Sequence, residues 1–160
     1  MQEEPLYFPL FVDLRGKRVL IAGAGRIAKK RIRAMLEFGA DVTVVAPRVS
    51  ESVQALAEEG KLTLLRRVFA SEDVTGAQLV FAATGNEEAN AQIAACCRKN
   101  GIPVNDGSCP ARCDFFFPAV VRRDPLVVGL TTCGRDHAGT KAARQAIERL
   151  LDEAKNEPNE

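Results

Sequence analysis

The feature of this sequence that most constrains its fold is a regular alternation of short apolar runs with segments of helical periodicity. The apolar runs have the length of buried strands and cover residues 18–22, 41–46, 61–68, 79–83 and 102–105. Helical periodicity is found after Gly25, after Ser50 and over 87–99, and Gly39 and Gly60 supply stops for the first two helices. In a parallel sheet each crossover helix packs against the sheet with right-handed sense. The alternation therefore predicts an α/β fold with a Rossmann-like, doubly wound parallel sheet.

The alternation ends after Asn105. An aromatic strand is expected over 115–121, followed by a turn at 122–125, a strand over 126–131 and a last helix over 140–154. That helix carries one apolar stripe formed by Ala143, Ile147, Leu150 and Leu151. We therefore expect the sheet to be followed by a small α+β region.

Charge and cysteine usage exclude several classes of protein. The 160 residues carry 22 Lys and Arg against 21 Asp and Glu, so the net charge of +1 gives no basic footprint for nucleic acid. No apolar run approaches the roughly 20 residues of a membrane helix. The first residues also lack the positively charged region followed by an apolar stretch that is typical of an export signal. Five cysteines, an odd number, favour reduced thiols. We expect a cytoplasmic protein with neither nucleic acid nor membrane as partner.

A glycine motif lies between the first predicted strand and the first predicted helix. Its pattern is Gly23-x-Gly25-x-x-Ala28. Gly23 permits a tight turn, Gly25 lets a pyrophosphate approach the backbone, and Ala28 keeps helix and strand close. The start of the helix then presents free amides and a positive dipole end to the phosphates. The motif predicts a dinucleotide site, and an ordinary glycine turn is the alternative.

The nucleotide preference depends on the end of the second strand. The acidic residue that usually holds the ribose hydroxyls is missing there, where the sequence is Val45-Ala46-Pro47-Arg48. Arg48 either meets a 2′-phosphate or is solvated. Backbone contacts at Pro47 can still hold the ribose, so we expect NAD as the cofactor.

Several separate blocks of sequence occur in an order that resembles one known family. They are residues 7–20, the glycine loop, 42–47, Ala82-Ala83-Thr84 with Asn90 beyond, 103–105, and Cys113-Asp114-Phe115-Phe116-Phe117-Pro118-Ala119. Together they look like the dehydrogenase part of siroheme synthase, over nearly the whole chain.

This resemblance implies an enzyme that oxidises precorrin-2, a tetrapyrrole, to sirohydrochlorin with NAD⁺ in siroheme biosynthesis. It also implies a homodimer, and some members of the family insert iron as ferrochelatases. At the matching positions, Arg26, Ile27, Pro47 and Arg48 would contact the cofactor, and Thr84 and Asn105 would line its nicotinamide side. The implied organisation is a dinucleotide-binding Rossmann domain over 1–112, a dimerisation and substrate region over 113–155, and a polar tail over 156–160.

The carboxylates of precorrin-2 would need positively charged side chains to bind them. Candidate cations are Arg112, Arg122, Arg123, Arg135 and Lys141. For each of them a solvated surface position is the alternative.

Two positions depart from the family pattern. Ser108 stands where the family carries an Asp that is its proposed acid and base, which leaves Asp106 as the candidate catalytic group. The pair Asp106-Gly107 can equally form a structural turn.

The second departure lies over residues 131–137 and introduces Cys133 and His137. Together with Cys109 and Cys113 they form a set of soft ligands. They have a spacing that a metal would tolerate, although loop packing explains them as well, and we assign no metal ligand. The alternative function is therefore a non-catalytic dinucleotide-sensing or metal-sensing module of the same fold.

Overall fold

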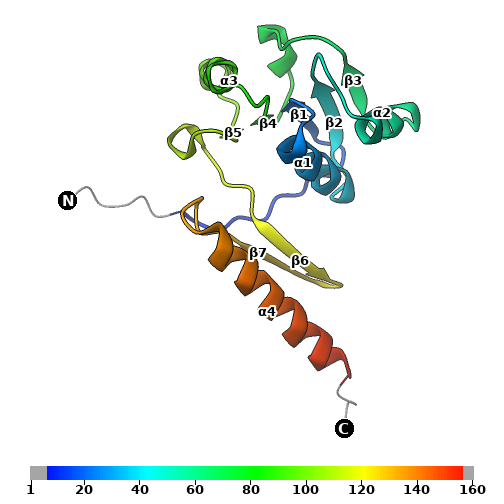
Figure 1. Cartoon of the computed structure of the whole chain (residues 1–160), viewed down its shortest axis with the longest axis vertical. Coiled ribbons are helices and arrows are strands. Elements are labelled where there is room, and N and C mark those ends of the chain that lie inside the picture. Colours follow the sequence, from blue (N-terminus) through cyan, green and yellow to red (C-terminus); the bar gives the residue numbers. More distant parts are fainter. Residues whose placement is uncertain (1–6, 157–160) are drawn as a thin grey trace, which may run out of the picture. The chain divides into compact units, whose positions relative to one another are not determined.

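A computed structural model describes residues 7–156 of the chain. It contains a five-stranded, fully parallel sheet in the order β3-β2-β1-β4-β5 (Figure 1). Its strands are β1 (Arg18–Ala22), β2 (Asp41–Val45), β3 (Thr63–Leu65), β4 (Leu79–Ala82) and β5 (Val104–Asp106). The helices between them are α1 (Arg26–Glu37), α2 (Glu51–Glu58) and α3 (Glu87–Lys99), with short 3₁₀ turns η1 (Ser71–Val74) and η2 (Pro110–Arg112). The predicted doubly wound parallel sheet is confirmed.

The chain divides into two compact units. One unit is Asp13–Phe117, and the other groups Pro118–Glu160 with Met1–Val12, of which 118–156 and 7–12 are described. The first unit holds the whole parallel sheet. The polar tail expected over 156–160 lies outside the described residues, apart from Asn156 at the end of the last helix.

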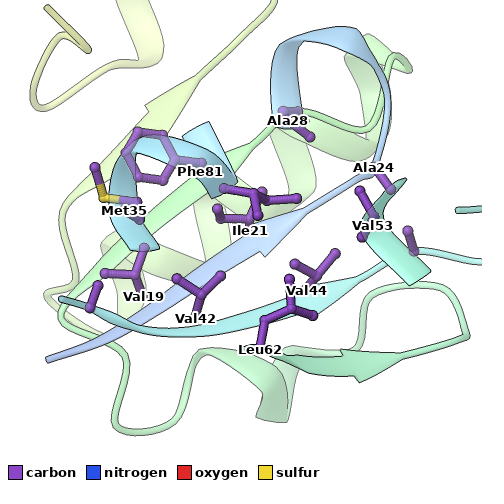
Figure 2. Packing of buried hydrophobic residues seen from close by; sticks show 14 of the residues in the cluster. Val19, Ile21, Ala24, Ala28, Met35, Val42, Val44, Val53, Leu62 and Phe81 are labelled. Atoms are coloured by element: carbon purple, nitrogen blue, oxygen red, sulfur yellow. The ribbon is translucent and has the colours of Figure 1, made fainter. Parts of the chain in front are cut away.

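One face of the parallel sheet is covered by α1 and α2. Val19, Ile21, Val42 and Val44 alternate along β1 and β2 and point to this face, as the period of two in a strand requires. Ala28 and Met35 of α1 and Val53 of α2 belong to the same core cluster as these side chains. Figure 2 shows Met35 beside Phe81 and Val53 beside Ala24. The small Ala24 and Ala28 keep α1 close to the end of β1.

The other face is covered by α3. Leu20, Ala22, Val80 and Val104 point to this face, and Ile93, Ala94 and Cys97 of α3 pack on them. Asn86 caps α3 by accepting a hydrogen bond from the Ala89 amide, Glu87 and Glu88 stand in its first turn, and Arg98 and Lys99 in its last. These end signals explain why the predicted bounds of this helix, 87–99, are confirmed.

The second unit contains a hairpin and one helix. Strands β6 (Ala119–Arg123) and β7 (Leu126–Leu130) pair antiparallel, and α4 (His137–Asn156) follows. Arg123 Nε donates to Asp152 Oδ1 at 2.8 Å and so ties β6 to α4. The expected small α+β region is confirmed.

Three predicted elements differ from the structure. β3 covers only three residues of the predicted 61–68, because it is an edge strand that pairs with β2 alone. The aromatic segment is not a strand before Ala119, because Phe115 and Phe117 pack into the core of the first unit instead of pairing. α4 begins at His137 and not at Thr140, because Asp136 Oδ1 accepts the Gly139 amide at 2.7 Å and caps the earlier turn. Among the described helices, none is both long and apolar enough to cross a bilayer.

Candidate functional site

A cleft of about 330 Å³ opens at the carboxyl edge of the parallel sheet. Its walls are the segments that follow β1, β4 and β5: Gly25, Arg26, Ile27, Ala83, Thr84, Gly85, Glu87, Asn90, Gly107 and Ser108. The chain crosses from β1 to β2 in one direction and returns to β4 on the other side of β1, so this edge is the topological switch point. Open α/β sheets bind ligands at that place. A larger hollow of about 650 Å³, lined by Arg33, Ala40 and Lys61 among others, lies at the opposite edge and has no such relation to the strand ends.

Gly23 is required by the close approach of two strands. Its φ is +111°, and a Cβ built there would lie 2.1 Å from the carbonyl oxygen of Ala83. Its own amide donates to the Val45 carbonyl at 2.8 Å, which ties the start of the glycine loop to the end of β2. No side chain fits at this position, and the positive φ is the backbone conformation that glycine favours in a tight turn.

Gly25 has a different role. A Cβ there would meet no atom within 4 Å, so the missing side chain leaves open space in the cleft. Gly25 is the N-cap of α1, no side chain caps this helix, and no acidic residue stands in its first turn. The unpaired first-turn amides and the positive helix end therefore face the space that Gly25 leaves. This bare backbone fits a pyrophosphate.

A hydrogen-bonded network holds the far wall of the cleft. Asn90, which is buried at 2% exposure, accepts from Thr84 Oγ1 at 2.7 Å and from the Thr84 amide at 3.1 Å. Its Nδ2 donates to Ser108 Oγ at 3.1 Å. The loops after β4 and β5 are thus joined through one amide side chain, and both hydroxyl residues, Thr84 and Ser108, line the cleft.

Asp106 lies behind this wall. Its Oδ1 accepts from Ser108 Oγ at 2.6 Å and from the Ser108 amide at 2.8 Å, and its Oδ2 accepts from Arg112 Nε at 2.6 Å. Burial acts to raise the pKa of Asp106, but the hydrogen bonds from Ser108 and Arg112 together outweigh it and hold the pKa below its ordinary value. The carboxylate is therefore ionised and fully partnered, and it is not among the cleft-lining residues. Its role as acid and base stays a prediction.

Asn105 makes its side-chain hydrogen bonds within the first unit and not toward the cleft. Its Nδ2 donates to the Phe115 carbonyl at 2.9 Å and to Cys113 Sγ at 3.4 Å, and the Asp106 amide donates to the same sulfur at 3.2 Å. Asn105 thereby fastens the segment that carries the aromatic residues to β5. It does not line the cleft, and its contact with a nicotinamide remains a prediction.

The two other cofactor positions stand outside the 330 Å³ cleft. Pro47 and Arg48 follow the end of β2 and are exposed. Arg26 and Ile27 line the cleft from the first turn of α1, as expected of the residues after the glycine loop.

The metal alternative finds no geometric support in the described residues. Within 7–156 no three His, Cys, Asp or Glu side chains gather in a way that could hold a metal ion. Cys113 is engaged by the backbone of Asp106, and burial, the largest influence, raises the pKa of its thiol. Such a thiol behaves as a packed side chain and not as a thiolate ligand.

Asn90 was not singled out as a site residue from sequence. The signal that marks it is its position in the apolar stripe of α3, where the buried residues are Asn90, Ile93, Ala94 and Cys97. A polar residue on a buried helix face needs partners, and here the partners are the two cleft hydroxyl residues.

Residues 10–119 match a family described as putative NAD(P)-binding. The chain belongs to this family. The match includes the glycine loop, the loops after β4 and β5 and the aromatic segment, so the cleft described above lies within the NAD(P)-binding part of the family.

Siroheme synthases from several bacteria resemble the chain over most of its length. It is 38% identical over 145 residues to a siroheme synthase of Methylococcus capsulatus, covering 91% of this chain and 31% of that protein. It is 39% identical over 151 residues to a siroheme synthase of Pseudomonas entomophila, covering 94% of this chain and 33% of that protein. The chain thus spans about a third of the length of the curated relatives it matches. The resemblance seen in the sequence is confirmed.

A solved structure agrees with these relatives. It is SirC, a precorrin-2 dehydrogenase, which superposes with a TM-score of 0.78 at 29% sequence identity and covers 90% of this chain and 71% of that chain. The agreement extends beyond the parallel sheet, since 90% of this chain reaches into the second unit.

Proposed function

We propose that the chain is an NAD-dependent dehydrogenase that oxidises precorrin-2 to sirohydrochlorin. The observation that carries this proposal is the bare cleft at the switch point, where Gly25 leaves open space in front of uncapped amides of α1. The siroheme synthase relatives and the precorrin-2 dehydrogenase neighbour support the choice of substrate.

The reaction requires few reactive side chains from the protein. Precorrin-2 loses a hydride and a proton and gains the extended conjugation of sirohydrochlorin. NAD⁺, when bound, supplies the hydride acceptor. The chain's part is to hold both reactants in line and to exclude water from the hydride path.

The described residues divide this work between two walls. On the α1 side, the backbone from Gly23 to Ile27 would hold the pyrophosphate through its amides. On the other side, Thr84, Asn90 and Ser108 form a wall fixed by their mutual hydrogen bonds, against which the nicotinamide end would lie. Asp106 and Arg112 hold Ser108 in place from behind.

The proton has two acceptors near this wall. Ser108 lines the cleft and its Oγ donates to the Asp106 carboxylate, so a proton accepted by Ser108 Oγ would be relayed as the serine's own proton moves to Asp106. Glu87, exposed at the cleft, is the other carboxylate within reach of the wall.

The test is anaerobic turnover of precorrin-2 with NAD⁺, followed by NADH absorbance and by the chromophore change. We expect one NADH formed per sirohydrochlorin in the wild-type protein and none in a Gly25→Val variant, whose Cβ meets no protein atom within 4 Å and whose methyl groups enter the pyrophosphate space. NAD⁺ binding without turnover would reject the dehydrogenase and leave a binding module.

A dinucleotide-sensing module is the second candidate, and one observation favours it. The predicted acid and base, Asp106, is already held by an ion pair with Arg112 and by hydrogen bonds from Ser108, and it does not line the cleft. A module of this kind would bind the dinucleotide and leave precorrin-2 unchanged. The same assay separates the two candidates.

We further propose that the protein is a cytoplasmic homodimer. A two-stranded sheet is marginal by itself. In the second unit β6 and β7 are only partly covered, with Leu126 at 44% and Leu150 of α4 at 63% exposure. A second copy can cover these apolar side chains, so the region 113–155 is our candidate for dimerisation.

A further inference from the structure

The end of β2 lies directly beside the glycine loop. β1 and β2 pair in parallel with Ala22 opposite Val45, and the Gly23 amide donates to the Val45 carbonyl at 2.8 Å. In a Rossmann fold whose pyrophosphate lies on the first glycine loop, the adenosine ribose reaches the end of the second strand. The residues just after Val45 are therefore the ones that meet the 2′ position of that ribose.

The charge at this place is positive. No carboxylate occurs between Asp41, at the far end of β2, and Glu51, the first residue of α2. Arg48 stands three residues after the strand, exposed, and within residues 7–156 its side chain has no ion pair or hydrogen bond. A carboxylate here would accept the ribose hydroxyls and repel a 2′-phosphate, and its replacement by a free guanidinium reverses both effects.

Two neighbours strengthen this placement. Arg66 follows β3, whose Leu65 is paired with Val45, and its Nη2 is held by Gln54 Oε1 of α2 at 2.5 Å. Ser50, two residues after Arg48, is the N-cap of α2 but makes no side-chain cap bond, and its hydroxyl reaches only Ser52 at 3.2 Å. The same sheet edge thus offers a second cation and a hydroxyl that is free to serve a ligand.

We propose that this site accepts a dinucleotide phosphorylated at the 2′ position of its adenosine ribose at least as well as NAD, with Arg48 as the residue that binds that phosphate. The inference rests on the proposed dinucleotide site and names its nucleotide preference. Arg48 offers parallel donors to the phosphate oxygens. The phosphate adds about two negative charges at neutral pH, and no acidic side chain stands between Arg48 and the strand end to oppose them.

The experiment is a calorimetric titration of the full chain with NAD⁺, NADP⁺, 5′-ADP and adenosine 2′,5′-bisphosphate. Calorimetry suits the protein because it contains no Trp for intrinsic fluorescence. The test variant is Arg48→Glu. The matched control is Arg33→Glu, which makes the same charge change on an exposed residue of α1 beside the hollow at the opposite edge of the sheet.

We expect the wild-type protein to bind NADP⁺ with a Kd no larger than its Kd for NAD⁺. We also expect it to bind adenosine 2′,5′-bisphosphate more tightly than 5′-ADP. Arg48→Glu should lower the affinity for NADP⁺ at least about tenfold more than that for NAD⁺, which corresponds to about 1.4 kcal/mol. Arg33→Glu should leave the NAD⁺ to NADP⁺ ratio unchanged. A thermal melt of each variant establishes that it is folded.

The results that would overturn the nucleotide preference differ from the result that would overturn the proposed function. NAD⁺ binding that is much tighter than NADP⁺ binding, with a ratio that Arg48→Glu leaves unchanged, would overturn this inference and keep the proposed function. A ratio shifted equally by both substitutions would also overturn it, since the effect would then come from net charge. Failure of both dinucleotides to bind would overturn the proposed function itself.

Discussion

Arg112 donates from Nε to Oδ2 of Asp106 at 2.6 Å, and the Asp106 side chain is fully buried at this contact. The pair connects η2 to the end of β5, and through Ser108 it reaches the wall of the cleft. Asp106, the candidate catalytic group from sequence, thus anchors a cleft-lining loop in the structure, and its role as acid and base stays a prediction.

Replacing Arg112 alone should lower the free energy of unfolding more than replacing both Arg112 and Asp106. Arg112→Met leaves the Asp106 carboxylate buried beside Ser108 without its cation, and we expect a loss of about 3 kcal/mol in the free energy of unfolding. The double variant Asp106→Asn with Arg112→Met removes the stranded charge and should recover part of that loss. Urea unfolding measures both. A double variant less stable than Arg112→Met would contradict this account.

Acid should destabilise the protein through two buried carboxylates. The Arg67 guanidinium lowers the pKa of Asp73, and the bonds from Ser108 and Arg112 outweigh burial to lower that of Asp106, each from an ordinary value of 3.8. A folded-state pKa below the unfolded value gives stability that is present above pH 3.8 and is lost as the pH falls through the folded values. Urea midpoints measured from pH 7 down to pH 3 should fall most steeply below pH 4, and less steeply in Asp106→Asn. A midpoint independent of pH in this window would speak against the ion pairs.

The two glycines of the loop should separate folding from binding. Gly23→Ala places a Cβ 2.1 Å from the Ala83 carbonyl oxygen at a positive φ, so we expect about 3 kcal/mol or more of lost stability. Gly25→Ala meets nothing within 4 Å and should cost less than about 1 kcal/mol. Thermal melts of the two variants provide the comparison. Equal losses would mean that the loop is packed differently from the structure.

Phe117 should matter to the first unit although it lies at the unit's end. Its ring stands edge-on to Phe81 with centroids 5.8 Å apart, and the Arg31 guanidinium carbon lies 4.5 Å above it. Phe117→Ala removes both contacts, and we expect a loss of about 2 to 3 kcal/mol, with Phe117→Leu losing less. An unchanged urea midpoint for Phe117→Ala would show that the aromatic segment does not pack on the sheet.

The fold followed from the sequence where local signals and core packing agree. α3 has an Asn cap, acidic residues in its first turn and basic residues in its last, so its bounds could be predicted to the residue. The aromatic segment shows the limit. Alternating Phe115 and Phe117 have the period of a strand, but their partners are Phe81 and α1 across the core, which a local pattern does not contain.

The glycine loop and the positions of Arg26, Ile27 and Thr84 in the cleft could be predicted from sequence, but the hydrogen-bonded network of the site could not. Gly23 and Gly25 sit in a contiguous motif whose geometry is fixed by a strand, a turn and a helix. The network from Thr84 through Asn90 to Ser108 spans two loops that become neighbours only when β4 and β5 pair. Asp106 looked available because Arg112, its partner, lies beyond a loop whose path the sequence does not reveal.

The central claim is that the space at Gly25 receives the pyrophosphate of a dinucleotide. Titration of the wild-type chain and of Gly25→Val with NAD⁺, under conditions where both are folded, tests it most directly. We predict one saturable site in the wild type and at least about a tenfold loss of affinity in the variant, or about 1.4 kcal/mol. Equal affinity in the two proteins, or no saturable binding by the wild type, would contradict the claim.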